Sequence, residues 1–178
     1  MSPVGRKVIV LLASSETNAG MRAWAQARGF DLARDYDGNP RPADRFDFHV
    51  TLVASANEVF VPETQHVIRP IGIDPEGFDV LGVDRKVPVL KMVPSARLAA
   101  MRAFFVDVYG IEPTFAEYRP HVSLSYSWDG LPDLEGLELP DMPLVFDQLR
   151  VKTLSPPAAK SIDWSAFGMA LGGLMRSA

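Results

Sequence analysis

Two short stretches of this chain place a hydroxyl residue two positions after a histidine. They read Phe48-His49-Val50-Thr51-Leu52 and Pro120-His121-Val122-Ser123-Leu124. Both have the apolar alternation of a β-strand, in which residues i and i+2 point to the same face. His49 and Thr51 therefore share a face, and the second stretch repeats the geometry with His121 and Ser123. If the two strands lie side by side, two imidazoles and two hydroxyls line one cleft, and such a set can perform general acid–base chemistry on a phosphodiester.

Two other interpretations of the histidines are core packing and metal binding. Two of the chain's three histidines carry the pattern, so a pair of ordinary core histidines would leave the matching hydroxyls as coincidence. A metal site is conceivable because imidazole binds zinc readily. However, the third histidine, His66, has a different sequence context, and Asp47 is the only carboxylate within either predicted strand. We therefore expect no metal and no other cofactor, and we expect His66 to be a surface residue.

The two motifs resemble those of the two-histidine (2H) phosphoesterase superfamily, whose signature is a pair of His-apolar-Thr/Ser-apolar stretches. "FHVTLVAS" is similar to the first motif and "YRPHVSLSY" to the second. The superfamily resemblance covers about residues 6 to 154. The layout in which "VPVLKM" leads into a helix before the second motif also resembles, more loosely, the phage anti-CBASS phosphodiesterases, which degrade cyclic oligonucleotide signals of bacterial defence.

The resemblance implies a metal-independent phosphoric diester hydrolase with His49, Thr51, His121 and Ser123 as catalytic residues. Its expected substrate is a small cyclic nucleotide or oligonucleotide. Two alternatives stay open: processing of RNA ends that carry a 2′,3′-cyclic phosphate, and a non-catalytic nucleotide-binding module. The sequence does not decide which histidine is the acid and which the base.

Composition narrows the possible partners. The formal net charge is −4 and 47% of the residues are apolar, which is ordinary for a globular protein. Proteins that bind long nucleic acids usually carry a basic face, and no such face is evident, so a small nucleotide fits better than a polymer. There is no cysteine and no long apolar stretch, so we expect a cytoplasmic protein without disulfides or membrane contact. The sequence indicates no oligomeric state.

The order of predicted elements contains an internal repeat. A strand, a serine cap, a helix, a glycine, a loop and a histidine strand occur in residues 7–54 and again in residues 86–127. Such a repeat predicts one α+β domain with a pseudo-two-fold, bilobal arrangement: antiparallel-rich sheets with flanking helices around a central cleft. The 2H superfamily has this form. Residues 65–73 and 77–83 are two further predicted strands, which could form a hairpin around Asp74-Pro75-Glu76-Gly77.

Several residues flank the motifs. Arg119 has the parity of His121 and could clamp a phosphate, while Tyr118 and Trp128 could stack on a base; for both aromatics, core packing is the alternative. Residues 129–147 contain six acids and no base, which indicates a solvated connector or a lid. The chain from about residue 155, which includes Trp164, is either a docked short helix or a tail.

Overall fold

The computed structural model describes residues 4–82 and 86–154. Its described elements are two α-helices, one short 3-10 helix and nine strands. In chain order they are β1 (Val4–Gly5), β2 (Lys7–Ala13), α1 (Ser15–Ala27), η1 (Ala43–Arg45), β3 (His49–Ala54), β4 (Val59–Phe60), β5 (Thr64–Gly72), β6 (Pro75–Leu81), β7 (Val87–Met92), α2 (Ala96–Tyr109), β8 (His121–Ser123) and β9 (Val145–Thr153). The prediction of a docked helix or tail from about residue 155 falls outside the described residues.

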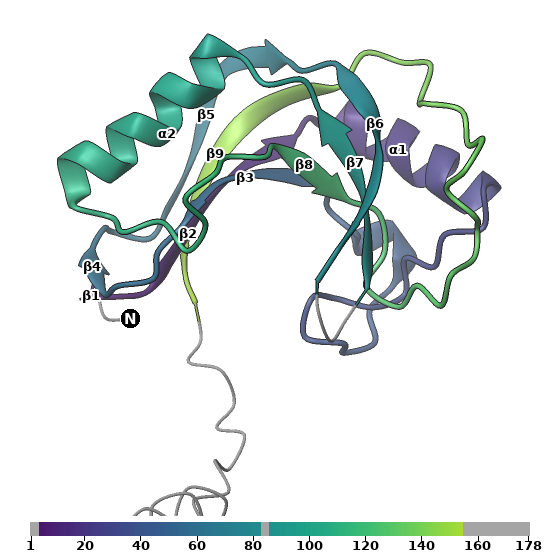
Figure 1. The fold of residues 1–178 in the computed structure, drawn as a ribbon, viewed down its shortest axis with the longest axis horizontal. Coiled ribbons are helices and arrows are strands. Elements are labelled where there is room, and N and C mark those ends of the chain that lie inside the picture. The colour runs from purple at the N-terminus through teal and green to yellow at the C-terminus, as the bar shows by residue number, and fades with distance from the viewer. Residues whose placement is uncertain (1–3, 83–85, 155–178) are drawn as a thin grey trace, which may run out of the picture.

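Seven strands form one sheet in the order β5-β9-β2-β3-β8-β7-β6, and every neighbouring pair in it is antiparallel. The two short strands β1 and β4 pair separately. The large sheet is bent into an arch, with both α-helices on its outer side (Figure 1). The predicted α+β class with antiparallel strands is therefore confirmed.

The two copies of the repeat lie next to each other in this sheet. The first copy supplies β2, α1 and β3, and the second supplies β7, α2 and β8. Each helix begins at a serine whose side chain accepts a backbone N–H: Ser14 from Thr17, and Ser95 from Leu98. In the sheet order β2-β3-β8-β7 the two copies meet at β3 and β8, so the two histidine strands are neighbours.

The expected hairpin between residues 65–73 and 77–83 is wrong. β5 pairs with β9 at one edge of the sheet, whereas β6 pairs with β7 at the opposite edge. At the connection, the Ile73 N–H donates to the Leu144 carbonyl and the Asp74 carbonyl accepts from Val93. The chain therefore continues from one edge strand directly into the other instead of folding back. This crossing, visible at the top of the arch in Figure 1, brings the two sheet edges together at that end.

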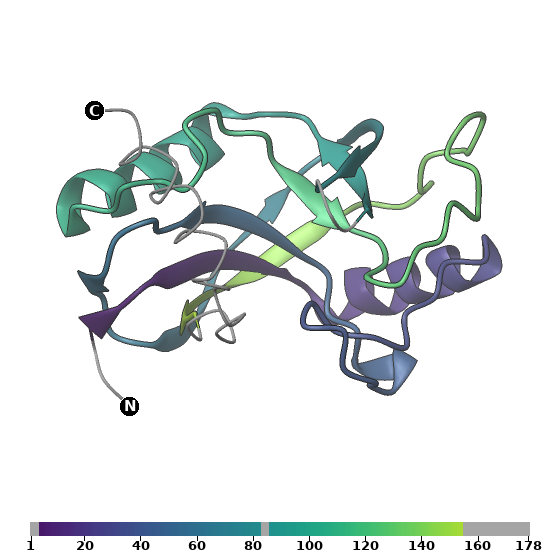
Figure 2. The ribbon, with the colours of Figure 1, turned by 60° about the horizontal axis from the view of Figure 1, so that its bottom comes forward.

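The hydrophobic core lies between the outer face of the sheet and the two α-helices. Val50, Leu52 and Val122 have almost no exposed surface, and they belong to one cluster with Met21 of α1 and Leu98 of α2. Since side chains alternate along a strand, the residues between them must face the inner side of the arch. Figure 2 shows this side more directly, with the two α-helices lying to either side of the strands.

The long loop between β8 and β9 packs against α1. Met142 lies so close to Gly20 that a Cβ on Gly20 would be 2.5 Å from the Met142 sulfur. Thr17 accepts a hydrogen bond from Val145 and donates one to the Pro143 carbonyl. The acidic segment 129–147 is thereby attached at its end to the outer helix α1, which supports the connector interpretation over the lid.

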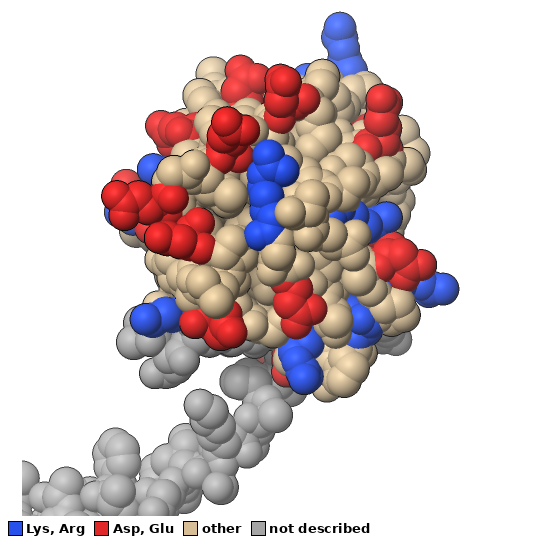
Figure 3. All heavy atoms as spheres, turned by 90° about the vertical axis from the view of Figure 1, so that its right-hand side faces the viewer, with Lys and Arg blue, Asp and Glu red and all other residues tan. Residues whose placement is uncertain are grey.

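Two features of the surface concern partners. Of the described residues, none belongs to a helix long and apolar enough to cross a membrane. On the face shown in Figure 3, acidic and basic side chains are interspersed, and no broad basic surface is visible there.

Candidate active site

The pairing of β3 with β8 brings the two motifs together. Val50 lies opposite Val122 in an antiparallel register. In the same register, the residues next to this pair on the two strands are also opposite each other: His49 lies opposite Ser123, and Thr51 lies opposite His121. All four side chains are half-buried, whereas Val50 and Val122 between them are fully buried on the other face. The imidazoles are therefore diagonal neighbours, and residues in that relation are typically about 7–8 Å apart in antiparallel sheets, with their Cβ atoms somewhat closer.

Both imidazoles are held in the same way. His49 Nδ1 lies 3.2 Å from the carbonyl oxygen of Asp47, and His121 Nδ1 lies 2.8 Å from that of Arg119. Because a carbonyl oxygen can only accept, each Nδ1 must carry the proton. Each Nε2 is then free to exchange a proton with a ligand, and no described residue forms a hydrogen bond to either Nε2.

Helix α1 fixes the start of the first motif through Asn18, which is 8% exposed. Its side-chain oxygen accepts from the Phe48 N–H at 2.8 Å, and its amide donates to the Ala13 carbonyl at 2.9 Å. Arg22 adds a hydrogen bond to the Phe46 carbonyl. A buried amide that bridges β2 and the residue before His49 holds that backbone in place, so Asn18 is a positioning residue that sequence reasoning missed.

The electrostatic surroundings differ between the two histidines. Burial lowers the pKa of His49, and the nearby positive charges of His121, Lys152 and Arg150 lower it further. The hydrogen bond to the Asp47 carbonyl acts in the opposite direction. At neutral pH His49 is therefore held in its neutral form, the form that accepts a proton.

Three cations share the inner face with the motifs. Lys91 of β7 lies directly opposite His121. On the side of β3 away from β8, but on the same face of the sheet, Arg150 of β9 lies opposite Val10 of β2. Lys152 lies two residues further along β9. Sequence reasoning missed these cations, although Gln148, Arg150 and Lys152 alternate with Leu149 and Val151 in a pattern that indicates a polar strand face.

Arg119 contributes differently from the prediction. Its backbone carbonyl orients His121, while its guanidinium is 69% exposed and forms an ion pair with Glu117. This ion pair raises the pKa of Arg119, with a smaller contribution from Asp79. The side chain lies near the motif, but in this structure it is engaged by a carboxylate.

The two predicted stacking residues are packed into the protein. Tyr118 lies under the Arg102 guanidinium of α2 at 5.4 Å, and burial raises its pKa to about 12. The Trp128 ring packs against the core, and its indole N–H donates to the Pro132 carbonyl at 3.1 Å. The structure thus does not bring the Tyr118 ring together with the imidazoles, and it supports core packing for both residues.

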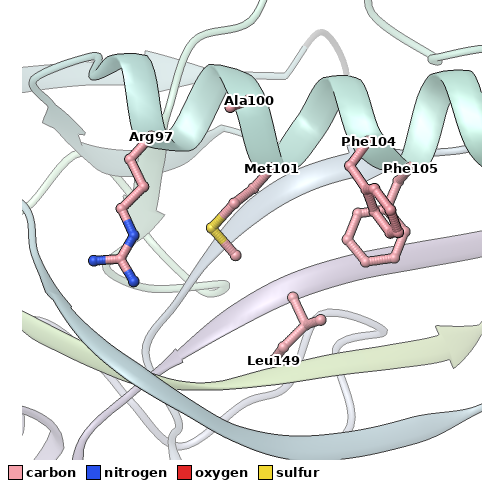
Figure 4. Close-up of a pocket in the computed structure, with 6 residues that line it drawn as sticks. All are labelled: Arg97, Ala100, Met101, Phe104, Phe105 and Leu149. Carbon is pink, nitrogen blue, oxygen red and sulfur yellow. The ribbon is translucent and has the colours of Figure 1, made fainter.

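Two apolar grooves lie elsewhere, between α2 and the outer face of the sheet. One, of about 350 Å³, is lined by α2 side chains that face Leu149 of β9 (Figure 4). The second, of about 370 Å³, adjoins it and includes His66. The His66 Nε2 lies 2.6 Å from the Thr64 hydroxyl, so the third histidine is exposed and lies on the opposite face of the sheet from the motif pair.

Among the described residues, no group of three or more His, Asp or Glu side chains has the arrangement of a metal site. The donor set at the motifs consists of two imidazoles and two hydroxyls, without a carboxylate between them. This set is suited to proton transfer and to hydrogen bonding of an anion.

Comparisons with known proteins add no family assignment. No protein-family model matches the chain, and no curated protein sequence matches it significantly.

Proposed function

We propose that this chain is a metal-independent phosphodiesterase that cleaves a small cyclic nucleotide or oligonucleotide. The observation that carries the proposal is the antiparallel register of β3 and β8, which sets two Nε2-free imidazoles diagonally on one face with a hydroxyl opposite each. The resemblance of both motifs to the 2H phosphoesterases supports the same chemistry. Cyclic di- and trinucleotides of the CBASS type are the candidate substrates that the looser resemblance suggests.

In the proposed reaction His49 is the base and His121 the acid. Nε2 of neutral His49 takes a proton from the attacking water or ribose 2′-hydroxyl, and the oxygen of that nucleophile forms a bond to phosphorus. The bond from phosphorus to the leaving oxygen breaks, and Nε2–H of protonated His121 donates its proton to that oxygen. The lowered pKa of His49 favours this assignment.

The remaining motif residues stabilise charge. The Thr51 and Ser123 hydroxyls each lie opposite an imidazole, where they can donate hydrogen bonds to the non-bridging phosphate oxygens. The Arg119 carbonyl, which accepts from His121 Nδ1, stabilises the positive charge of the protonated imidazole. The Asp47 carbonyl does the same for His49 after it takes the proton.

A turnover screen tests the proposal. The protein is incubated with cyclic dinucleotides, cyclic trinucleotides and nucleoside 2′,3′-cyclic phosphates, with and without EDTA, and products are separated by chromatography. We expect cleavage of at least one cyclic substrate at equal rates with and without EDTA, and none by the His49→Ala/His121→Ala double variant. Binding without turnover would indicate a nucleotide-binding module, and activity lost to EDTA but restored by zinc or manganese would indicate a His-ligated metal.

A further inference from the structure

The inner face of the sheet carries a second polar group, two strands away from the motif pair. Arg150 of β9 lies opposite Val10 of β2, and Val10 lies opposite Thr51 of β3. Since neighbouring strands are about 4.8 Å apart, the backbones of Arg150 and Thr51 are separated by about 10 Å on the same face. The apolar side chains of Val10 and Leu12, which are 5% and 7% exposed, lie between them.

Arg150 is oriented by two amides. Its Nε–H donates to the Gln65 side-chain oxygen at 2.8 Å, and the Gln65 amide donates in turn to Gln148. Both glutamines lie on the same inner face: Gln65 is directly opposite Arg150 on β5, and Gln148 is two residues before it on β9. A guanidinium fixed through Nε keeps its two Nη groups in one plane, the arrangement that binds an oxyanion with two parallel hydrogen bonds.

Arg150 and Lys152 form no ion pair with a carboxylate of the described residues. The ion pairs found within residues 4–82 and 86–154 are Arg22–Asp47 and Arg119–Glu117, and neither involves Arg150 or Lys152. On the inner face, Asp79 lies at the far side of the motif pair beyond β7. Asp147 lies three residues before Arg150 on β9, at the irregularity of the β2–β9 register. Arg150 and Lys152 also act on His49, because both charges contribute to its lowered pKa.

We propose that Arg150 and Lys152 form a second phosphate site, so that the preferred substrate carries a phosphate group in addition to the diester between His49 and His121. This inference rests on the proposed function and narrows its substrate class. A dinucleotide with two phosphates or a cyclic dinucleotide is long enough to reach both sites across the intervening strand β2. A nucleoside 2′,3′-cyclic monophosphate occupies only the motif site.

Calorimetric binding of matched dinucleotides tests the second site without requiring turnover. The His121→Ala variant is titrated with ApA, which has one phosphate, and with pApA and ApAp, in which the second phosphate precedes or follows the diester. We expect at least one of the two-phosphate ligands to bind about tenfold or more tightly than ApA, as expected for a charge-assisted contact. Adding Arg150→Gln should remove most of that preference and leave the ApA affinity within about twofold.

Two further variants serve as control and safeguard. Arg97→Gln removes the same charge from α2, on the outer side, and should change no affinity. If Arg150→Gln perturbs the fold through Gln65, as circular dichroism would show, Lys152→Gln tests the same site from an exposed position and should also reduce the two-phosphate preference. Equal weakening of all three ligands, no preference for a second phosphate, or no binding of any ligand would each overturn the inference.

Failure of this inference and failure of the proposed function are distinguishable. Arg150-dependent binding of pApA or ApAp together with a negative turnover screen would leave the phosphate site standing and remove the catalytic proposal. Turnover in which Arg150→Gln slows one-phosphate and two-phosphate substrates by the same factor would remove only the second phosphate site.

Discussion

The two motif histidines have the same backbone hydrogen bond but different surroundings. Each donates Nδ1–H to the carbonyl two residues before it, which leaves Nε2 as the reactive atom. Burial and neighbouring cations disfavour a proton on His49. An acid–base pair requires one neutral and one protonated member, and the lowered pKa of His49 makes it the candidate for the neutral member.

The pH dependence of kcat/KM should therefore be bell-shaped, reporting two macroscopic values of the pair. Its acid limb reports loss of the proton from His49, and because the pKa of that group is lowered, the limb should lie below the ordinary histidine value of about 6.5. Lys152→Gln removes one of the positive charges that lower this pKa, so the limb should move to higher pH.

Rates on a one-phosphate substrate at constant ionic strength provide this measurement, because such a substrate does not depend on the second phosphate site. Arg97→Gln, on the outer side, is the control and should leave the limb in place. An acid limb above pH 6.5 in the unsubstituted protein, or a shift to lower pH in Lys152→Gln, would contradict the assignment of His49 as the base.

At the residue scale, period-two alternation was sufficient to predict that each histidine and its hydroxyl share a face. It was not sufficient for Arg119, which has the right parity but whose guanidinium is held by Glu117. Nor did it identify Arg150 as a neighbour, because Arg150 lies about 100 positions along the chain from His49. That relationship depends on β2 pairing with both β3 and β9, which no local pattern contains.

At the scale of elements, local signals identified both helices and their caps. Ser95 caps α2 as predicted, Ser14 caps α1 within the predicted stretch of caps at residues 14–17, and Gly110 ends α2 in the left-handed conformation, with φ of 63°. The sequence predicted less well those features that depend on contacts with residues far away in the chain. The apolar spacing of Leu98, Met101, Phe105 and Val108 predicts one buried stripe on α2, yet Val108 is 60% exposed. The hairpin of β5 with β6 does not form because β5 pairs with β9 at one edge of the sheet and β6 pairs with β7 at the opposite edge.

The cap of α2 can be tested by substituting glycine. Gly110→Ala places a Cβ in open space but forces a left-handed φ on a residue with a side chain, so we expect the free energy of unfolding to fall by about 1 kcal/mol. Gly72→Ala is the matched control, because its Cβ also meets nothing and its φ lies outside the left-handed region. Urea unfolding of both variants gives the comparison, and an equal cost at the two positions would contradict the role of Gly110 in the cap.

At the scale of the whole molecule, the arch brings two similar units into one sheet. The β3–β8 pairing joins the units at the site, and the β5–β6 connection joins the two sheet edges at the far end. The repeat could be recognised in the sequence. The β5–β6 connection between the two sheet edges and the curvature of the sheet depend on long-range strand pairing, which could not be recognised there. One buried cluster also extends across both units, from Trp24 of α1 to Phe105 of α2.

A shared core predicts a single unfolding transition. Denaturation followed by tryptophan fluorescence should coincide with denaturation followed by far-ultraviolet circular dichroism. The fluorescence reports on Trp24 in α1 and Trp128 in the β8–β9 loop, and a Trp164→Phe background removes the signal of the third tryptophan, which lies outside the described residues. Two separate transitions would show that the two repeat units are independently stable lobes, with the site at a weak junction between them.

The central claim, that His49 and His121 form a metal-independent acid–base pair, is tested most directly by single histidine substitutions on a confirmed substrate in EDTA. His49→Ala and His121→Ala should each lower kcat by about 10²- to 10⁴-fold while circular dichroism stays unchanged. His66→Ala, on the opposite face of the sheet, should retain the full rate. A rate near that of the unsubstituted protein in either motif variant, or a loss in His66→Ala as large as theirs, would contradict the account.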